Sequence, residues 1–301
     1  MKPDHPAIAI TGANGFIGSH LVSMFREAGY SVVAFSREAQ THLQDGVTRR
    51  RFDLEPESGQ PDLTGCGVLI HCAYIKHLPK QDTGQLNVLG TRRLYEAAKQ
   101  AGVKQFIFFS SLSAHDHAIS SYGRMKYEIE TSLDLKTDLI LKPGLVLGSG
   151  GLFGNLVHTV SHSWAVPLVD GGRQLLQTID LEDVGKCVAA AVERGAVGRF
   201  TLVADEPLTL RDMVKTIRIQ SKRKPLLLSV PYWMVSLGLR LAELLRIPLS
   251  VGRENLLGLK QNILWETGDC LREFGVKPIP PIASIQRLMG QTSHGKSIIR
   301  K

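Results

Sequence analysis

The chain has 301 residues, 43% of them hydrophobic, with 36 lysines and arginines against 28 aspartates and glutamates. These values are typical of a globular protein with one large core and a smaller lobe, and they exclude a low-complexity chain. The formal net charge of +8 favours anionic cofactors and substrates. No recognised nucleic-acid-binding motif accompanies the charge, so nucleic acid is not an expected partner.

The first apolar run, Ala7–Ile10, leads into a glycine-rich turn at Thr11–Gly18. The run predicts a buried parallel strand, and Phe16–Arg26 predicts a helix that ends at Gly29. Glycines in such a turn allow close backbone approach to a pyrophosphate, and the helix N-terminus offers it N–H groups. The pattern predicts a dinucleotide site formed by Gly12, Asn14, Gly15, Phe16, Ile17 and Gly18.

The next expected strand, Ser31–Phe35, ends in Ser36 and Arg37. An NAD-binding protein usually places a carboxylate there against the ribose 2′-hydroxyl, and a carboxylate would repel a 2′-phosphate. Ser36 and Arg37 could bind one instead, so we predict a preference for NADP(H), with NAD(H) as the other option. The alternative interpretation is that Arg37 is a solvated surface residue.

Tyr122 and Lys126 are four residues apart and share one face of a helix expected over 122–133. An unperturbed tyrosine has a pKa of about 10, and a nearby ammonium would favour its phenolate, allowing acid–base catalysis near neutral pH. The strand predicted from Phe106 ends in Ser110 and Ser111, whose hydroxyls would emerge where ligands of parallel sheets bind. Combined with the glycine turn, this pattern indicates an oxidoreductase.

Strand-like runs alternate with helical patterns through the first half of the chain, which predicts βαβ units and a parallel sheet. The further expected strands are Val68–Cys72, Phe106–Phe109 and Leu139–Leu147, and the further helix is Val88–Ala101. We therefore predict an α/β fold with a Rossmann-type doubly wound sheet in residues 1–150 and returning elements at about 174–206. Residues 151–301 should form mainly a smaller, interleaved substrate lobe, with 291–301 a disordered tail.

The chain resembles an extended or atypical short-chain dehydrogenase/reductase of the NAD-dependent epimerase/dehydratase family over nearly its whole length. The resemblance rests on the glycine turn, on Tyr122 and Lys126, and on four further segments: Phe52–Leu54, Ile70–Ala73, a helix start at Asn87, and Lys142–Val146. It implies that Tyr122 exchanges the substrate proton, that Lys126 binds the nicotinamide ribose, and that Ser111 holds the reacting oxygen. It adds to the cofactor site Asp53, Leu54, Cys72, Ala73, Asn87, Lys126 and Pro143.

The chain departs from relatives that epimerise sugars in the segment after Ser111. Ala114–Asp116 stands where they usually have Val-Tyr-Gly, and the short gap to Tyr122 implies a trimmed loop. Ser113 is a second hydroxyl close to the substrate. The resemblance implies a nucleotide-sugar 4-ketoreductase or 4-epimerase. The alternatives are an enzyme of a lipophilic alcohol or ketone, or a non-catalytic NADP(H)-binding sensor or structural subunit, although such proteins typically lose the Tyr or the Lys.

Two features of the second half bear on the substrate and the partners. Arg173 could grip a substrate diphosphate, or it could be a solvated loop arginine. Pro231–Arg246 predicts an apolar helix, for which a place in the core of the smaller lobe is favoured over contact with a membrane surface. The resemblance allows a homodimer.

The cysteines and histidines point to no special chemistry. Cys66, Cys72, Cys187 and Cys270 lack metal-type spacing, and no signal peptide precedes the first strand, so a reduced cytoplasm is expected. No metal site is predicted, because neither His115/His117 nor His158/His162 has an accompanying Glu or Cys in a known ligand pattern.

Overall fold

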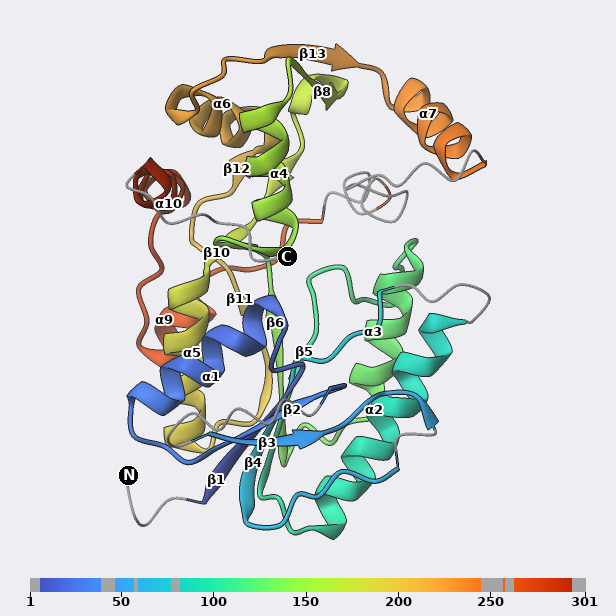
Figure 1. The fold of residues 1–301 in the computed structure, drawn as a ribbon, viewed down its shortest axis with the longest axis vertical. Coiled ribbons are helices and arrows are strands. Elements are labelled where there is room, and N and C mark those ends of the chain that lie inside the picture. Colours follow the sequence, from blue (N-terminus) through green and yellow to red (C-terminus); the bar gives the residue numbers. More distant parts are fainter. Residues whose placement is uncertain are drawn as a thin grey trace. The chain divides into compact units, whose positions relative to one another are not determined.

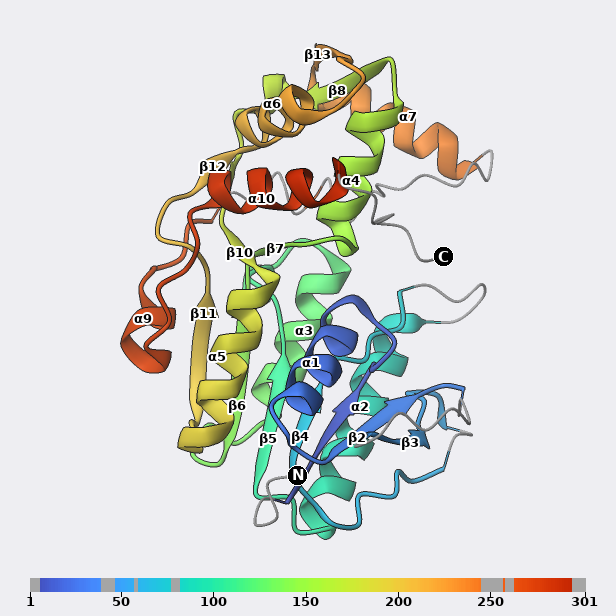
Figure 2. The ribbon, with the colours of Figure 1, turned by 60° about the vertical axis from the view of Figure 1, so that its left-hand side comes forward.

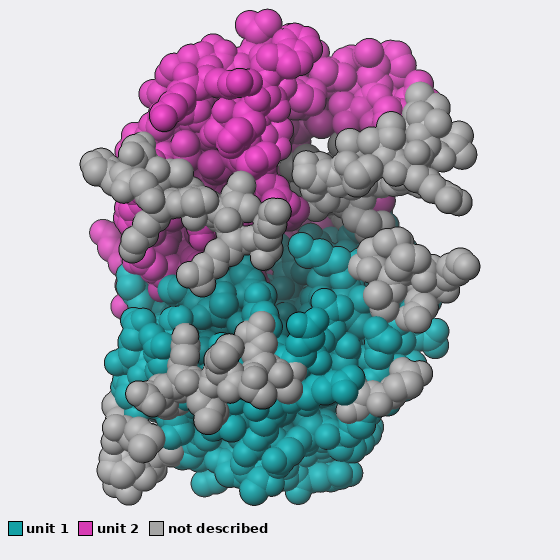
Figure 3. All heavy atoms as spheres, in the orientation of Figure 1, with its two compact units in different colours: residues 1–142, 185–201 teal, residues 143–184, 202–301 magenta. Residues whose placement is uncertain are grey.

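The computed structural model describes residues 6–38, 47–56, 59–76, 82–244, 257 and 263–293. The chain divides into two compact units, the first comprising residues 1–142 and 185–201 and the second 143–184 and 202–301 (Figure 3). The chain therefore passes three times from one unit to the other. Among the described residues, no helix is long and apolar enough to cross a membrane.

Unit 1 is built on a seven-stranded sheet with the order β11-β6-β5-β4-β1-β2-β3 (Figure 2). Its strands are β1 (Ala7–Thr11), β2 (Val32–Ser36), β3 (Val47–Arg51), β4 (Cys66–His71), β5 (Gln105–Phe109), β6 (Asp138–Pro143) and β11 (Gly198–Leu202). The pairings that join β1 through β6 are all parallel. The order reverses between β1 and β4, and in such sheets ligands bind outside the carboxyl ends of the strands at that reversal.

Four helices flank this sheet. They are α1 (Phe16–Glu27), α2 (Thr83–Gln100), α3 (Ser121–Thr131) and α5 (Leu181–Arg194). Figures 1 and 2 show α1 beside α5 on one face and α2 beside α3 on the other. Every residue of β5 is buried, as expected for a strand covered on both faces. The predicted doubly wound parallel sheet is confirmed.

Two predicted boundaries in unit 1 are wrong for physical reasons. α2 begins at Thr83 rather than Val88, because the Asp82 carboxylate caps it by accepting a hydrogen bond from the Gln85 N–H. Asn87 therefore lies inside the helix and does not start it. The predicted strand 139–147 is two strands, β6 and β7 (Leu145–Leu147), which belong to different sheets.

Unit 2 has a small core of its own, formed where α4 (Gly151–His162), α6 (Leu210–Gln220) and α10 (Pro281–Ser293) pack together. Its strands pair in three two-stranded sheets: β7 with β10 (Thr178–Asp180), β9 (Leu175–Leu176) with β12 (Leu208–Thr209), and β8 (Ala165–Val169) with β13 (Leu226–Val230). A 3₁₀ turn, η2, spans Asp170–Gly172, and α7 (Tyr232–Leu244) and α9 (Asp269–Phe274) complete the described elements. Inside unit 2, Arg287 and Ser284 of α10 donate to the buried Asp180 carboxylate.

The C-terminal predictions need correction. The helix expected over 231–246 is present as α7. One face of it packs on Val169 through Tyr232, Val235 and Leu239, whereas Trp233, Met234 and Leu237 are exposed. The expected tail 291–301 is helical as far as Ser293, because α10 continues to that residue. Residues 245–246 and 294–301 lie outside the described residues.

Candidate active site

The glycine turn follows β1 and is packed so tightly that larger residues do not fit. Gly12 has a φ of +67°, and a Cβ there would lie 2.8 Å from the Ala73 nitrogen. A Cβ on Gly18 would lie 2.2 Å from the Gly12 carbonyl oxygen. Gly15 caps α1 without a side chain, so the first-turn N–H groups, which have no partner within a helix, remain available to a phosphate. This cradle fits a dinucleotide, as predicted from Gly12 through Gly18.

At the end of β2, the polar groups that are available to a cofactor differ from those predicted. The Ser36 hydroxyl is buried and donates to the Glu38 carbonyl oxygen at 2.6 Å, whereas Arg37 is exposed. Arg49 on β3 reaches the glycine turn, where its Nη1 donates to Asn14 Oδ1 at 3.4 Å. Its Nε is buried and has no hydrogen-bond partner among the described residues.

Sequence reasoning missed Arg49. Alternation along the Val47–Arg51 strand would have placed Arg49 and Arg51 on one face and Arg50 on the other. Arg50 does point elsewhere, donating to the carbonyl oxygens of Asp62 and Thr64. The contact with Asn14, however, depends on the position of a distant turn.

The end of β4 is tied to the glycine turn by a buried histidine. His71 Nδ1 lies 2.6 Å from Thr11 Oγ1, and its Nε2 lies 2.9 Å from Thr91 Oγ1 on α2. Burial and the Lys126 charge lower the pKa of His71 to about 3, so the imidazole is neutral. Beyond it, the Cys72 and Ala73 N–H groups donate to Thr11, and burial raises the pKa of the Cys72 thiol to about 12. The predicted residues Cys72 and Ala73 therefore lie against the turn.

Three other predicted cofactor residues shape the walls of this region. Asp53 accepts from the Leu54 N–H at 2.7 Å, and a Cβ on Gly90 of α2 would lie 2.4 Å from the Leu54 carbonyl oxygen. The buried Asn87 amide accepts from the Ile75 N–H and donates to the carbonyl oxygens of Ile75 and Thr83. Asn87 thus holds the segment after β4 through backbone contacts.

Tyr122 and Ser111 are brought together beyond the end of β5. The Tyr122 hydroxyl is hydrogen-bonded to the Ser111 side chain, and its ring meets the Tyr74 ring edge-on, with centroids 5.2 Å apart. Burial, with a smaller contribution from Tyr74, raises the pKa of Tyr122 to about 12, and the bond to Ser111 opposes this rise. The expected lowering toward neutral pH is therefore wrong for the protein alone. The second candidate, Ser113, presents its N–H to Ser111 Oγ at 3.2 Å.

Lys126 lies one turn further along α3 and is buried. Its Nζ donates to the Phe109 carbonyl oxygen at 2.7 Å and lies 4.5 Å from the centroid of the Phe108 ring. Burial lowers the pKa of Lys126 to about 8, while Cys72 and Glu130 act in the opposite direction. The ammonium is thereby fixed near the end of β5, on the same helix as Tyr122.

A buried ionic cluster, which sequence reasoning did not identify, supports the segment 110–114 that contains Ser111. Glu130 on α3 accepts from the Ser110 hydroxyl, from Lys142 Nζ at 3.2 Å and from Arg199 Nε at 3.2 Å. Lys142 also donates to the Ala114 carbonyl oxygen. The cluster thus holds residues on both sides of Ser111. The available signal was the position of Glu130, four residues after Lys126 and next to the apolar Ile129 on the expected helix.

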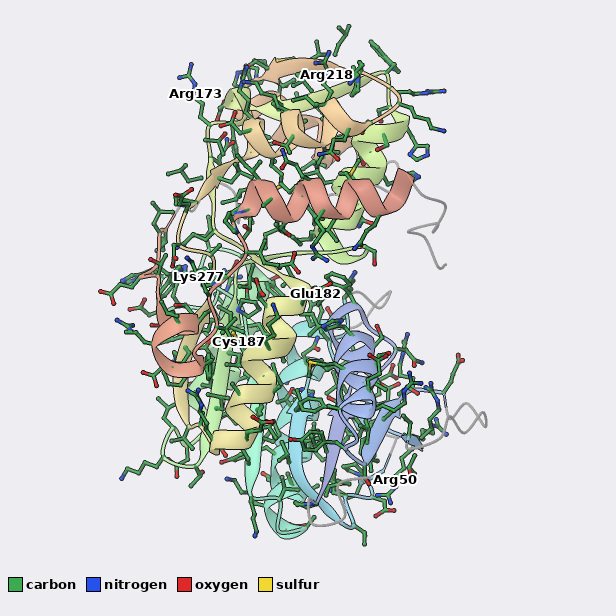
Figure 4. All side chains as sticks on the ribbon, turned by 90° about the vertical axis from the view of Figure 1, so that its left-hand side faces the viewer. Arg50, Arg173, Glu182, Cys187, Arg218 and Lys277 are labelled. Atoms are coloured by element: carbon green, nitrogen blue, oxygen red, sulfur yellow. The ribbon has the colours of Figure 1, made fainter. Side chains whose placement is uncertain are left out.

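Pro143 and Arg173 belong to unit 2. Pro143 is buried at the end of β6, whereas Arg173 is exposed after η2, and Figure 4 shows its side chain projecting away from the ribbon. In the described residues no group of three or more His, Cys, Asp or Glu side chains is placed to hold a metal ion.

The parallel sheet, the glycine cradle and the Tyr122–Ser111–Lys126 arrangement define a dinucleotide-binding oxidoreductase. The profile of the NAD dependent epimerase/dehydratase family matches residues 8–203, and the chain belongs to that family. It is thus an enzyme of the NAD-dependent oxidoreductase and epimerase class. The family prediction is confirmed.

Individual relatives are distant. The chain is 27% identical over 267 residues to UDP-glucose 4-epimerase of Vibrio cholerae, covering 77% of this chain and 80% of that protein. It is 33% identical over 156 residues to ceramide reductase of Caulobacter vibrioides, covering 48% and 47%. The crystal structure of UDP-glucose 4-epimerase from Thermotoga maritima with UDP-glucose shares the fold, with a TM-score of 0.75, 18% identity, and coverage of 96% and 99%.

Proposed function

We propose that the protein is an NADP(H)-dependent reductase of the short-chain dehydrogenase/reductase type that acts on the 4-keto group of a nucleotide-linked sugar, with 4-epimerisation as the related reaction. The observation that carries the proposal is the pairing of the Tyr122 hydroxyl with Ser111 beside the anchored ammonium of Lys126. These groups supply a proton donor, a second hydroxyl and a cation at one end of one sheet.

The nicotinamide cofactor, when bound, supplies or accepts the hydride. In the reductive direction Tyr122 donates its proton to the substrate carbonyl oxygen, and Ser111 donates a hydrogen bond to the same oxygen. A pKa of about 12 keeps Tyr122 protonated at neutral pH, as a proton donor requires. Lys126 would hold the ribose hydroxyls, and its ammonium on the same helix as Tyr122 would stabilise negative charge that develops on the substrate oxygen.

The expected preference for NADP(H) is supported by cations around the adenosine end of the predicted site. Arg37 is exposed after β2, and Arg49 brings a guanidinium with an unpartnered Nε to Asn14. A guanidinium binds a phosphate through two parallel hydrogen bonds, so Arg49 joins Arg37 as a candidate ligand of the 2′-phosphate. Ser36 contributes less than expected, because its hydroxyl is committed to Glu38.

A nucleotide-linked substrate is supported by the Vibrio cholerae relative, a UDP-glucose 4-epimerase. The exposed Arg173 is the proposed contact for the substrate diphosphate. A lipophilic ketone is the second candidate, supported by the relative described as a ceramide reductase and by the exposed apolar side chains of α7. A homodimer, which the family resemblance allows, and a cytoplasmic location, expected from the cysteine usage, remain proposals.

The reaction is tested by following NADPH oxidation with a panel of UDP-linked 4-keto-sugars and of long-chain ketones. Turnover with the sugars alone supports the first proposal. Turnover with the long-chain ketones alone replaces it with the second. Absence of turnover with either class, in protein that binds NADPH, contradicts both.

The cofactor preference is tested by Arg49→Gln, with Arg50→Gln as a control that removes the same charge one residue away. We expect Arg49→Gln to weaken NADPH binding by about tenfold or more and to leave NADH binding unchanged, since hydrogen bonds to charged groups contribute about 1.5–3 kcal/mol. Arg50→Gln should leave the ratio of the two affinities unchanged. Equal weakening for both cofactors would mean that Arg49 only supports the turn.

A further inference from the structure

Unit 2 carries a two-stranded sheet with one face left open. On one side of the β8–β13 pair, Val166 and Leu168 are buried against the unit 2 core. On the other side, Leu226 lies opposite Ala165 and Leu228 opposite Pro167, and the two leucines are 58% and 44% exposed. Because side chains alternate along a strand, these residues share the outer face. This outer face is apolar, and none of the described residues covers it.

Further exposed aromatic side chains lie beyond the two ends of this sheet. Trp164, whose carbonyl oxygen accepts from the Leu226 N–H, is 76% exposed. At the other end of the sheet, α7 packs on Val169 through its own apolar side chains, while Trp233 on the same helix is 65% exposed. Tryptophans exposed beside leucines are uncommon on a solvated surface and typical of a membrane interface.

A basic loop adjoins this apolar surface. Lys222, Arg223 and Lys224 immediately precede β13 and are all exposed. Arg223 donates to the His162 carbonyl oxygen, and Lys224 to the Ile219 carbonyl oxygen, which ties the loop to the ends of α4 and α6. The segments that form the surface contain no aspartate or glutamate, either in 151–169 or in 213–242. The patch therefore combines apolar side chains with three exposed cations at one end, while an exposed carboxylate, Asp170, follows β8 at the other end and accepts from the Tyr232 N–H.

We propose that the outer face of β8–β13, with Trp164 and the loop 222–224, docks on an anionic lipid bilayer. Leucine and tryptophan side chains enter the boundary between headgroups and acyl chains, and the three cations contact the anionic headgroups. Charge complementarity selects this partner over a second copy of the chain, since a two-fold contact through this face would bring two basic loops together. The proposal is independent of the substrate proposed above.

The test is sedimentation of the full-length protein with vesicles made of equal parts phosphatidylglycerol and phosphatidylcholine, compared with vesicles of phosphatidylcholine alone. We expect binding to the anionic vesicles at low salt, and loss of binding at high salt. Each cation near such a surface changes binding about fivefold. Replacement of Lys222, Arg223 and Lys224 by Gln should therefore weaken binding about a hundredfold. The matched control is Arg92→Gln/Lys104→Gln/Lys136→Gln, which removes three exposed cations of unit 1 and should retain binding.

A fluorescence measurement tests insertion without disturbing the basic loop. In Trp233→Phe/Trp265→Phe, Trp164 is the remaining tryptophan, and we expect brominated anionic lipids to quench it. The proposal is overturned if the protein binds NADPH but does not bind anionic vesicles, or if the control triple variant loses binding equally. It is also overturned if Leu226→Ser/Leu228→Ser converts a dimer to a monomer while vesicles bind neither form.

Discussion

Lys142→Met removes the cation of the buried Lys142–Glu130 ion pair, which supports the segment 110–114 around Ser111. The Lys142 side chain is 3% exposed and that of Glu130 is fully buried. Without Lys142, the partners of Glu130 among the described residues would be Ser110 and the partly exposed Arg199. Breaking a buried pair by removing one member costs about 3–5 kcal/mol. Because two partners of Glu130 remain, we expect a loss near the lower end, about 3 kcal/mol in the free energy of unfolding.

The assay is urea unfolding followed by far-ultraviolet circular dichroism, with turnover measured on the same preparations. Lys136→Met, at an exposed lysine of the same unit, is the control and should change stability by less than about 0.5 kcal/mol. Glu130→Gln/Lys142→Met should lose less stability than the sum of the two single variants, since the double change leaves no unpaired buried charge. Additive losses, or a loss below about 1 kcal/mol for Lys142→Met, would refute the reasoning.

Three further predictions concern other parts of unit 1. Gly18→Val should abolish NADPH binding in a fluorescence titration, because the valine Cβ would lie 2.2 Å from the Gly12 carbonyl oxygen. The control Gly238→Ala should bind NADPH normally, because nothing lies within 4 Å of a Cβ at that position. Unchanged NADPH affinity in Gly18→Val would contradict the proposed role of the glycine turn. Lys126 has a pKa of about 8 when folded against 10.5 ordinarily, so between these values its side chain binds more protons in the unfolded chain. The stability of the native protein relative to Lys126→Met should therefore rise with pH across that window, although the raised pKa of Cys72 lowers the stability of both. The same pH dependence in both proteins would exclude this contribution of Lys126. Asn87→Leu removes the amide that binds the Ile75 N–H and carbonyl oxygen, and it should lower the free energy of unfolding, measured by urea denaturation, by about 2–3 kcal/mol. A change within about 0.5 kcal/mol would show that water replaces the amide.

The sequence was sufficient for the features that local patterns determine. The alternation of apolar runs with amphipathic segments predicts the parallel sheet, and the glycine spacing predicts the tight turn at Gly12–Gly18. The i, i+4 spacing places Tyr122 and Lys126 on one helix face, and both lie on α3. Ser111 follows β5, and its side chain is hydrogen-bonded to the Tyr122 hydroxyl.

The features that depend on long-range contacts could not be predicted. Pro143 and Gly144 were the available sign of a break within 139–147. The close packing at Gly144, where a Cβ would lie 2.3 Å from the Gln177 carbonyl oxygen, depends on a distant segment. The contact between Arg49 and Asn14 depends on the packing of β3 beside β2. The direction of the Tyr122 pKa shift depends on burial and, to a smaller extent, on Tyr74, which together outweigh the hydrogen bond to Ser111.

The central claim is that Tyr122 is the proton donor of an NADPH-dependent carbonyl reduction. The most direct measurement is NADPH oxidation by Tyr122→Phe and by the native protein with the same 4-keto-sugar nucleotide, together with the NADPH affinity of each. We predict unchanged affinity and a fall in turnover of about 10²–10⁴-fold, the range that general acid catalysis contributes. Full turnover in Tyr122→Phe would contradict the assignment.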